Sequence, residues 1–96
     1  WMNTNREGVG IGYGLTVNRL GNAEYQYTFV TPQPDNNYAV LAQTQEQNFE
    51  TTRVKDKNVN GFKITTAWVK TENGNTELKY EDNAHAVAVF SALFPG

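Results

Sequence analysis

Residues 28–41 read Thr-Phe-Val-Thr-Pro-Gln-Pro-Asp-Asn-Asn-Tyr-Ala-Val-Leu, and this stretch decides the fold because two apolar runs flank a short break. Pro32 and Pro34 fix their own φ angles and donate no backbone hydrogen bond, so a strand must stop there. The Asp-Asn-Asn of residues 35–37 favours a turn. The apolar run that begins at Tyr38 then predicts a second strand.

Alternation with a period of two continues on both sides of this corner and is typical of strands. Upstream, glycine or threonine alternates with larger apolar residues, which should therefore share one face. These larger residues are Val9, Ile11, Tyr13, Leu15 and Val17. Gly21-Asn22 is a hairpin signal. The return strand should place Tyr25, Tyr27 and Phe29 on one face and polar residues on the other.

Downstream, residues 38–44 are apolar at both alternating positions, as in a strand covered on both faces. Residues 49–54 predict another strand, and the Lys-Asp-Lys-Asn of residues 55–58 predicts an exposed charged turn. Asn73-Gly74 predicts a tight turn, and residues 85–90 a last strand. No window of useful length holds the helix period. About six to seven short strands with regular turns indicate an all-β fold, an antiparallel β-sandwich in which residues 1–96 form one domain.

The apolar residues in phase along these strands predict the core. They are Phe29, Val40, Leu41, Phe49, Phe62, Ile64, Trp68, Val87 and Val89.

Composition narrows the function. The 96 residues carry a formal net charge of -2, so no basic excess exists to neutralise nucleic-acid phosphates or anionic membranes. No apolar run approaches the length of a membrane helix. The absence of cysteine excludes disulfides and thiolate catalysis. A chain that starts Trp1-Met2-Asn3 is expected to be a piece of a longer protein.

The spacing Pro32-x-Pro34-x-x-x-Tyr38-x-Val40 resembles a phrase of small β-sandwich modules near the ends of bacteriophage tail fibres. Those modules occur especially in phages of cyanobacteria and marine bacteria, and they resemble H-type lectin sandwiches. Residues 60–64 (Asn-Gly-Phe-Lys-Ile) and 86–90 (Ala-Val-Ala-Val-Phe) fit the same family. The similarity extends from about Val9 to Phe90.

This resemblance implies a receptor-binding module at the tip of a virion's tail fibre, outside the cell. It implies a homotrimer that contacts other fibre segments and a host surface glycan or other receptor. The alternative is a structural trimerisation or connector module without a host ligand. An enzyme is not expected, because no nucleophile motif is visible and a short chain could hardly hold two carboxylates across a cleft.

Binding is expected in loops, because loops vary without disturbing a core. Polar side chains can bond glycan hydroxyls, and an aromatic ring can cover a sugar face. The candidate loop residues are Asp35, Asn36, Asn37, Lys55, Asp56, Lys57, Asn73, Asn75 and Tyr80.

Two further features have a functional and a structural interpretation. Gly10, Gly12 and Gly14 leave one strand face without side chains, which suits either a subunit interface or internal packing under a bulky neighbour. His85, the one histidine, is expected to be structural, although a threefold axis could gather three copies around a metal. No cofactor or metal is expected within one chain.

Overall fold

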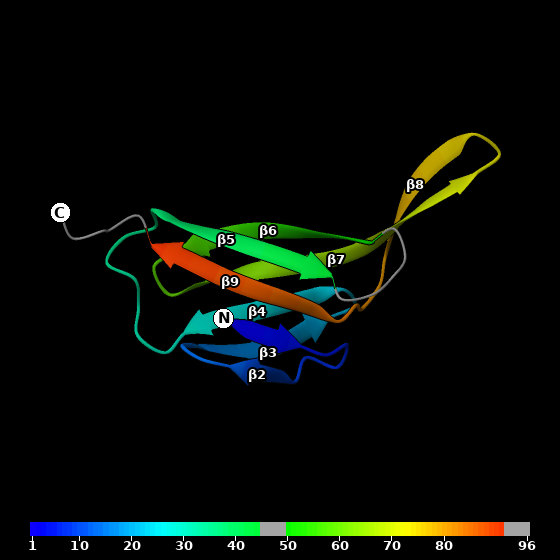
Figure 1. The fold of residues 1–96 in the computed structure, drawn as a ribbon. Helices are drawn as coiled ribbons and strands as arrows, with labels where there is room; N and C mark the ends of the chain where they lie inside the picture. The colour runs from blue at the N-terminus through cyan, green and yellow to red at the C-terminus, as the bar shows by residue number, and fades with distance from the viewer. Residues whose placement is uncertain (45–49, 92–96) are drawn as a thin grey trace.

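The computed structural model describes residues 1–44 and 50–91, and every regular element in these ranges is a β-strand (Figure 1). The strands are β1 (Met2–Thr4), β2 (Gly10–Gly12), β3 (Leu15–Gly21), β4 (Glu24–Phe29), β5 (Tyr38–Thr44), β6 (Glu50–Asn58), β7 (Gly61–Glu72), β8 (Asn75–Tyr80) and β9 (His85–Ser91).

The strands form two antiparallel sheets that pack face to face (Figure 1). Sheet A has the order β2-β1-β9-β5. Sheet B has the order β3-β4-β7-β6, and β8 pairs with the far half of β7. The predicted all-β sandwich is therefore confirmed. The described residues contain nine strands rather than six to seven, because β1 was not expected and the strand predicted over residues 9–17 is split in two.

The split occurs at Gly14, whose φ of 78° lies in the left-handed region that glycine adopts most easily. The chain leaves sheet A there and enters sheet B. Ile11 and Tyr13 consequently face solvent, whereas Leu15 is buried between the sheets. The prediction of one shared face across residues 9–17 was wrong, because the turn reverses which side of the chain faces the core.

The core between the sheets is more aromatic and more polar than predicted. Of the expected residues, Phe29, Phe62, Ile64 and Val87 are buried. Val40 and Val89 are partly buried against this core, Trp68 is half-buried, and Leu41 is exposed, so that prediction was wrong. Phe49 lies outside the described residues. Additional buried residues are Met2, Leu15, Ala23, Tyr25, Tyr27, Tyr38, Ala67 and His85.

The turns follow local sequence in most places. Residues 31–37 form the predicted corner between β4 and β5. Asn73 and Gly74 both have positive φ angles, 53° and 80°, as a tight hairpin turn requires. The predicted charged turn at residues 55–58 was wrong, because this segment is the end of β6, with a register shift and a φ of 52° at Asp56.

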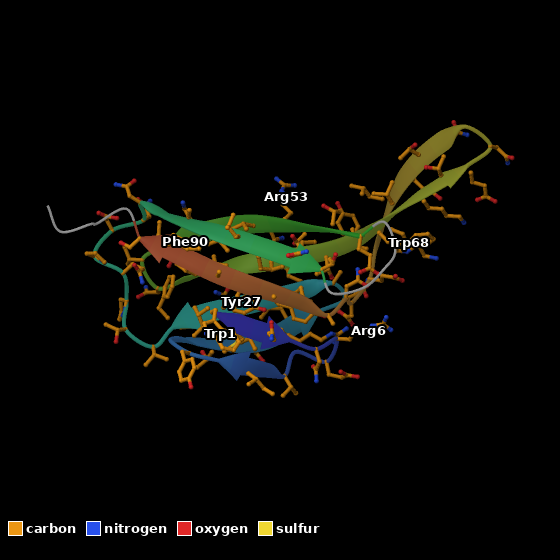
Figure 2. All side chains as sticks on the ribbon, in the orientation of Figure 1. Trp1, Arg6, Tyr27, Arg53, Trp68 and Phe90 are labelled. Carbon is orange, nitrogen blue, oxygen red and sulfur yellow. The ribbon has the colours of Figure 1, made fainter. Side chains whose placement is uncertain are left out.

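The far half of β7 and all of β8 extend beyond the sandwich as a two-stranded ribbon, at the upper right of Figure 1. We call residues 69–80 the arm. Every residue of β8 is exposed, and Figure 2 places Trp68 at the base of the arm. In the described part of the chain, no helix is long and apolar enough to cross a membrane.

Candidate functional site

Buried polar side chains mark many active sites. The His85 side chain lies between the sheets, and its Nε2 is 2.7 Å from the Tyr27 hydroxyl. That hydroxyl is also 2.6 Å from Oγ1 of Thr4. On the other side of the ring, Nδ1 lies 2.8 Å from the carbonyl oxygen of Asn83.

This geometry assigns the protons. A carbonyl oxygen can only accept, so Nδ1–H of His85 donates to Asn83 and Nε2 accepts from the Tyr27 hydroxyl. Thr4 then donates to Tyr27. Burial lowers the pKa of His85 and raises that of Tyr27 to about 12, so both groups are neutral at pH 7. Both ring nitrogens are engaged inside the fold, which makes His85 a structural residue of this chain.

A second polar cluster closes one end of the sandwich. The Asp82 carboxylate accepts hydrogen bonds from Nε of Arg19 at 2.9 Å and from the backbone N–H of Ala23 at 2.8 Å. The hydroxyl of Tyr25 lies 3.2 Å from the same carboxylate and donates at 2.7 Å to the carbonyl of Arg6. Partial burial alone would raise the pKa of Asp82, but the bonds from Arg19 and Ala23 lower it. The cluster ties the segment after the arm to the β3–β4 hairpin.

Within residues 1–44 and 50–91, no group of three or more His, Cys, Asp or Glu side chains is placed to hold a metal ion.

The nine loop candidates do not form one site. Asp35, Asn36 and Asn37 lie between β4 and β5 at the left end of Figure 1, where β6 also ends. Asn73, Asn75 and Tyr80 belong to the arm at the opposite end. Lys55 pairs with Glu24 at 3.1 Å, and Asp56 pairs with Lys63 at 3.4 Å, so these two lie along sheet B rather than in a loop.

Lys57 lies in the same region as Asp35, Asn36 and Asn37. Its Nζ donates to the carbonyl oxygen of Tyr38 at 2.6 Å and lies 5.0 Å from the centre of the Tyr38 ring. The backbone N–H of Gln33 donates to the carbonyl of Val59 at 2.8 Å, which joins the corner to the β6–β7 turn. We call this end, residues 31–37 and 57–60, the loop end. Asn36 and Asn37 are exposed there.

A hollow of about 190 Å³ opens beside the loop end. The residues that line it include Trp1, Tyr13, Gln33 and Ser91. The two rings meet edge to face, with centroids 6.0 Å apart and planes at 72°. The sequence did not single out Trp1, Tyr13 or Gln33 for binding, because the residues that line the hollow come from segments far apart in the chain, from Trp1 to Ser91.

The outer faces of the two sheets differ sharply in charge. On sheet B, Glu24, Lys55 and Lys63 point outward beside Gln26. On the strands of sheet A no outward side chain is charged. Those outward residues are Asn3, Ile11, Ala39, Leu41, Gln43, Ala86, Ala88 and Phe90, with Trp1 and Tyr13 at the strand ends.

The middle of that face is hollowed. A groove of about 550 Å³ is lined by Trp1, Asn3, Leu41, Gln43, Ala86 and Ala88, together with the backbone around Ala42 and Val87. The small Ala86 and Ala88 form its floor, with Leu41 and Trp1 on either side, since the register places Ala88 opposite Leu41. We call this the apolar groove.

The glycine face predicted as a candidate interface points inward. A Cβ at Gly10 would meet the Met2 side chain and, at 2.8 Å, Cγ1 of Val17. A Cβ at Gly12 would overlap the backbone of Trp1 and Met2. Only the third of these glycines, Gly14, has open space around it. The structure therefore supports internal packing for Gly10 and Gly12.

Comparisons with family models, with curated proteins and with solved structures found no match to this chain.

Proposed function

We propose that this chain is the receptor-binding module of a viral tail fibre, which attaches the virion to a host surface glycan or another exposed receptor through the loop end. The observation that carries the proposal is the corner of residues 31–37, in which Asn36 and Asn37 are exposed and Gln33 lines a hollow together with Trp1 and Tyr13. The module acts by binding alone, as part of the virion.

The chemistry of the loop end suits a sugar. Sugars present apolar C–H faces next to hydroxyl groups, and aromatic rings cover such faces while amides bond the hydroxyls. A hollow of about 190 Å³ is smaller than a drug-sized pocket of about 300–1,000 Å³. It therefore has room for one ring rather than a long oligosaccharide.

A single shallow site of this kind binds weakly. We propose that three copies act together, because presentation on one fibre makes each further contact intramolecular and can raise overall avidity by about 10²–10⁴. The partners are then two further copies of the chain, adjoining fibre segments and the receptor.

One observation favours the alternative, a structural connector without a host ligand. The uncharged outer face of sheet A is large enough to serve assembly alone. Trp1 and Tyr13 belong both to the hollow and to the outer face of sheet A, so the residues that separate the two functions are Asn36, Asn37 and Gln33 of the loop end.

The test is adsorption of the purified domain to cells that the virus infects. Alanine at Asn36 or Gln33 should reduce saturable adsorption by an order of magnitude or more, since avidity amplifies a small loss at each site. Asn75→Ala in the arm is the matched control and should bind like the unaltered domain. If the unaltered domain shows no saturable adsorption, receptor binding fails and the connector becomes the better account.

A further inference from the structure

The arm has two unlike faces. Side chains alternate across a strand, so cross-strand pairs share a face. Val69 pairs with Leu78, Thr71 with Thr76 and Ala67 with Tyr80, and these rows contain no charge. The intervening rows hold the charged groups, which include the Lys70–Glu72 ion pair at 3.1 Å. We call the face made by Val69, Thr71, Thr76, Leu78 and Tyr80 the uncharged stripe.

Most of this stripe faces solvent: Val69 at its base is half-buried, whereas Thr71, Thr76, Leu78 and Tyr80 are exposed. Leu78 and Tyr80 are each 54% exposed. Beyond Ala67, the register pairs β7 with β8 alone except at Trp68, which also faces Glu50. A two-stranded ribbon is marginally stable at best in water and normally needs a packed face. Figure 1 shows the arm leaving the end of the sandwich and pointing away from it, so the stripe is not packed on sheet A of its own chain.

The outer face of sheet A also lacks a cover. Trp1, Tyr13 and Phe90 are 54%, 76% and 53% exposed. At about 150–250 Å² for each aromatic side chain, these three leave roughly 280–460 Å² in contact with water. The exposed Ile11 and Leu41 add to that area.

The area of these three rings lies within the range of about 300–600 Å² for the largest apolar patch on a monomer, and such patches are often functional. A standard interface buries about 800 Å² on each partner, so the three rings supply roughly half of what one partner contributes. Ile11 and Leu41 extend the same face. The alternation in β5 agrees, because Ala39 and Leu41 make its outer side as apolar as its inner side.

We propose that the arm of one copy docks its uncharged stripe into the apolar groove of a second copy of this chain. The groove has small alanines on its floor and about 550 Å³ of space, which suits the inserted Leu78 and Tyr80 side chains. No side chain of the stripe or of the groove lining is charged, so their contact buries no charged side chain. The charged rows of the arm, with Lys70 and Glu72, remain in solvent.

The contact joins two different surfaces of the same chain. Such head-to-tail contacts close into rings or continue as filaments, depending on the rotation between copies. Each copy keeps its loop end outside the contact, at the end of the sandwich remote from its own arm. The inference does not depend on the receptor-binding proposal, because its test uses the oligomeric state and no receptor.

The experiment compares molar masses by light scattering at micromolar concentration, with circular dichroism to confirm folding. Leu78→Lys alters the stripe, and Ala88→Glu alters the groove. Asn18→Lys on the outer face of sheet B is the matched control, since it also adds a charge to an exposed strand position. The unaltered chain and the control should have a multiple of the 10.8 kDa chain mass.

Each single variant should fall to 10.8 kDa, and a chain that carries both changes should recover the larger mass through the new Lys–Glu pair. A monomeric unaltered chain would overturn the proposal. So would a Leu78→Lys variant that stays associated, because the sheet A faces would then pair without the arm. Should either single variant lose its β-sheet spectrum, Leu78→Ser and Ala88→Ser replace the charged variants, and each should lower the associated mass. No recovery is expected of the doubly substituted serine chain, because it lacks a Lys–Glu pair. A Leu78→Ser chain with an unchanged mass would overturn the proposal.

Discussion

The Tyr27 hydroxyl lies 2.7 Å from Nε2 of His85, at the centre of the interface between the sheets. Tyr27 belongs to β4 of sheet B and His85 to β9 of sheet A, so this bond joins the two layers directly. The Tyr27 ring also stacks on Phe62, with centroids 5.2 Å apart. The core is therefore held by a polar contact as well as by apolar packing.

Removing that hydroxyl should be costly. Tyr27→Phe leaves Nε2 of His85 and Oγ1 of Thr4 without their common partner in a buried site. An unsatisfied buried group costs about 1–3 kcal/mol, so the unfolding free energy should fall by that amount. Urea denaturation measures it. The exposed Tyr13→Phe is the control and should change stability by less than about 0.5 kcal/mol.

Stability should depend on pH through His85. Burial lowers its pKa in the folded state below the unfolded value of 6.5, so the unfolded chain binds the proton more readily. The contribution is complete above pH 6.5 and is lost as pH falls, by at most about 1.4 kcal/mol per pH unit. Urea midpoints at pH 7.5, 6.5 and 5.5 measure the slope. His85→Gln should be flat over this window, and a flat profile for the unaltered chain would contradict the assignment.

The stability that Asp82 contributes should be lost at a lower pH than the stability that His85 contributes. Its pKa is lowered from 3.8, so its contribution is present above that value and is lost as pH falls further. At neutral pH, Asp82→Ala leaves the buried backbone N–H of Ala23 without its acceptor, which costs about 1–3 kcal/mol. Thermal melting detects the loss. Asp35→Ala at the loop end is the control and should melt close to the unaltered protein. An equal fall in melting temperature for both variants would contradict a stabilising role for the Asp82 hydrogen bonds.

Alanine substitutions at Gly12, Gly61 and Gly21 should show which of these glycines are closely packed and which have open space around them. A Cβ at Gly12 would overlap backbone atoms of Trp1, and one at Gly61 would overlap the backbone of Tyr27. Both changes should destabilise by more than about 3 kcal/mol, because backbone cannot move aside cheaply. Gly21 has open space around it, so Gly21→Ala should be neutral or should stabilise by up to about 1 kcal/mol. Chemical denaturation of the three variants gives the order.

The sequence predicted the features that depend on neighbouring residues. The proline corner at residues 31–37 and the Asn73-Gly74 turn follow from local φ preferences, and both are present. Alternation identified most strands and four buried core residues, of which Phe62 and Ile64 are fully buried. It also predicted that β5 is covered on both faces, which was wrong for the single chain, because Ala39 and Leu41 on its outer side are exposed.

The errors arise where the tertiary fold decides. At Gly14 the chain passes from sheet A to sheet B, and the side of the chain that faces the core changes there. A two-residue alternation in the sequence does not reveal such a change. Leu41 and Val40 are equally apolar, so only the sheet arrangement shows that Leu41 faces outward. β7 is long enough to carry the arm beyond the sandwich, so the arm and the loop end lie at opposite ends. The predicted binding residues are therefore divided between these two ends. Trp1 and Tyr13 become a candidate surface only through the pairing of β1 with β2.

The most direct test of receptor binding at the loop end uses the absence of native cysteine. A single Asn36→Cys or Asn18→Cys can be coupled to a bulky maleimide, and adsorption to host cells is then measured before and after coupling. We predict that the label at residue 36 abolishes saturable adsorption and that the label at residue 18, on sheet B, leaves it unchanged. Undiminished adsorption of the domain labelled at residue 36 would contradict the account.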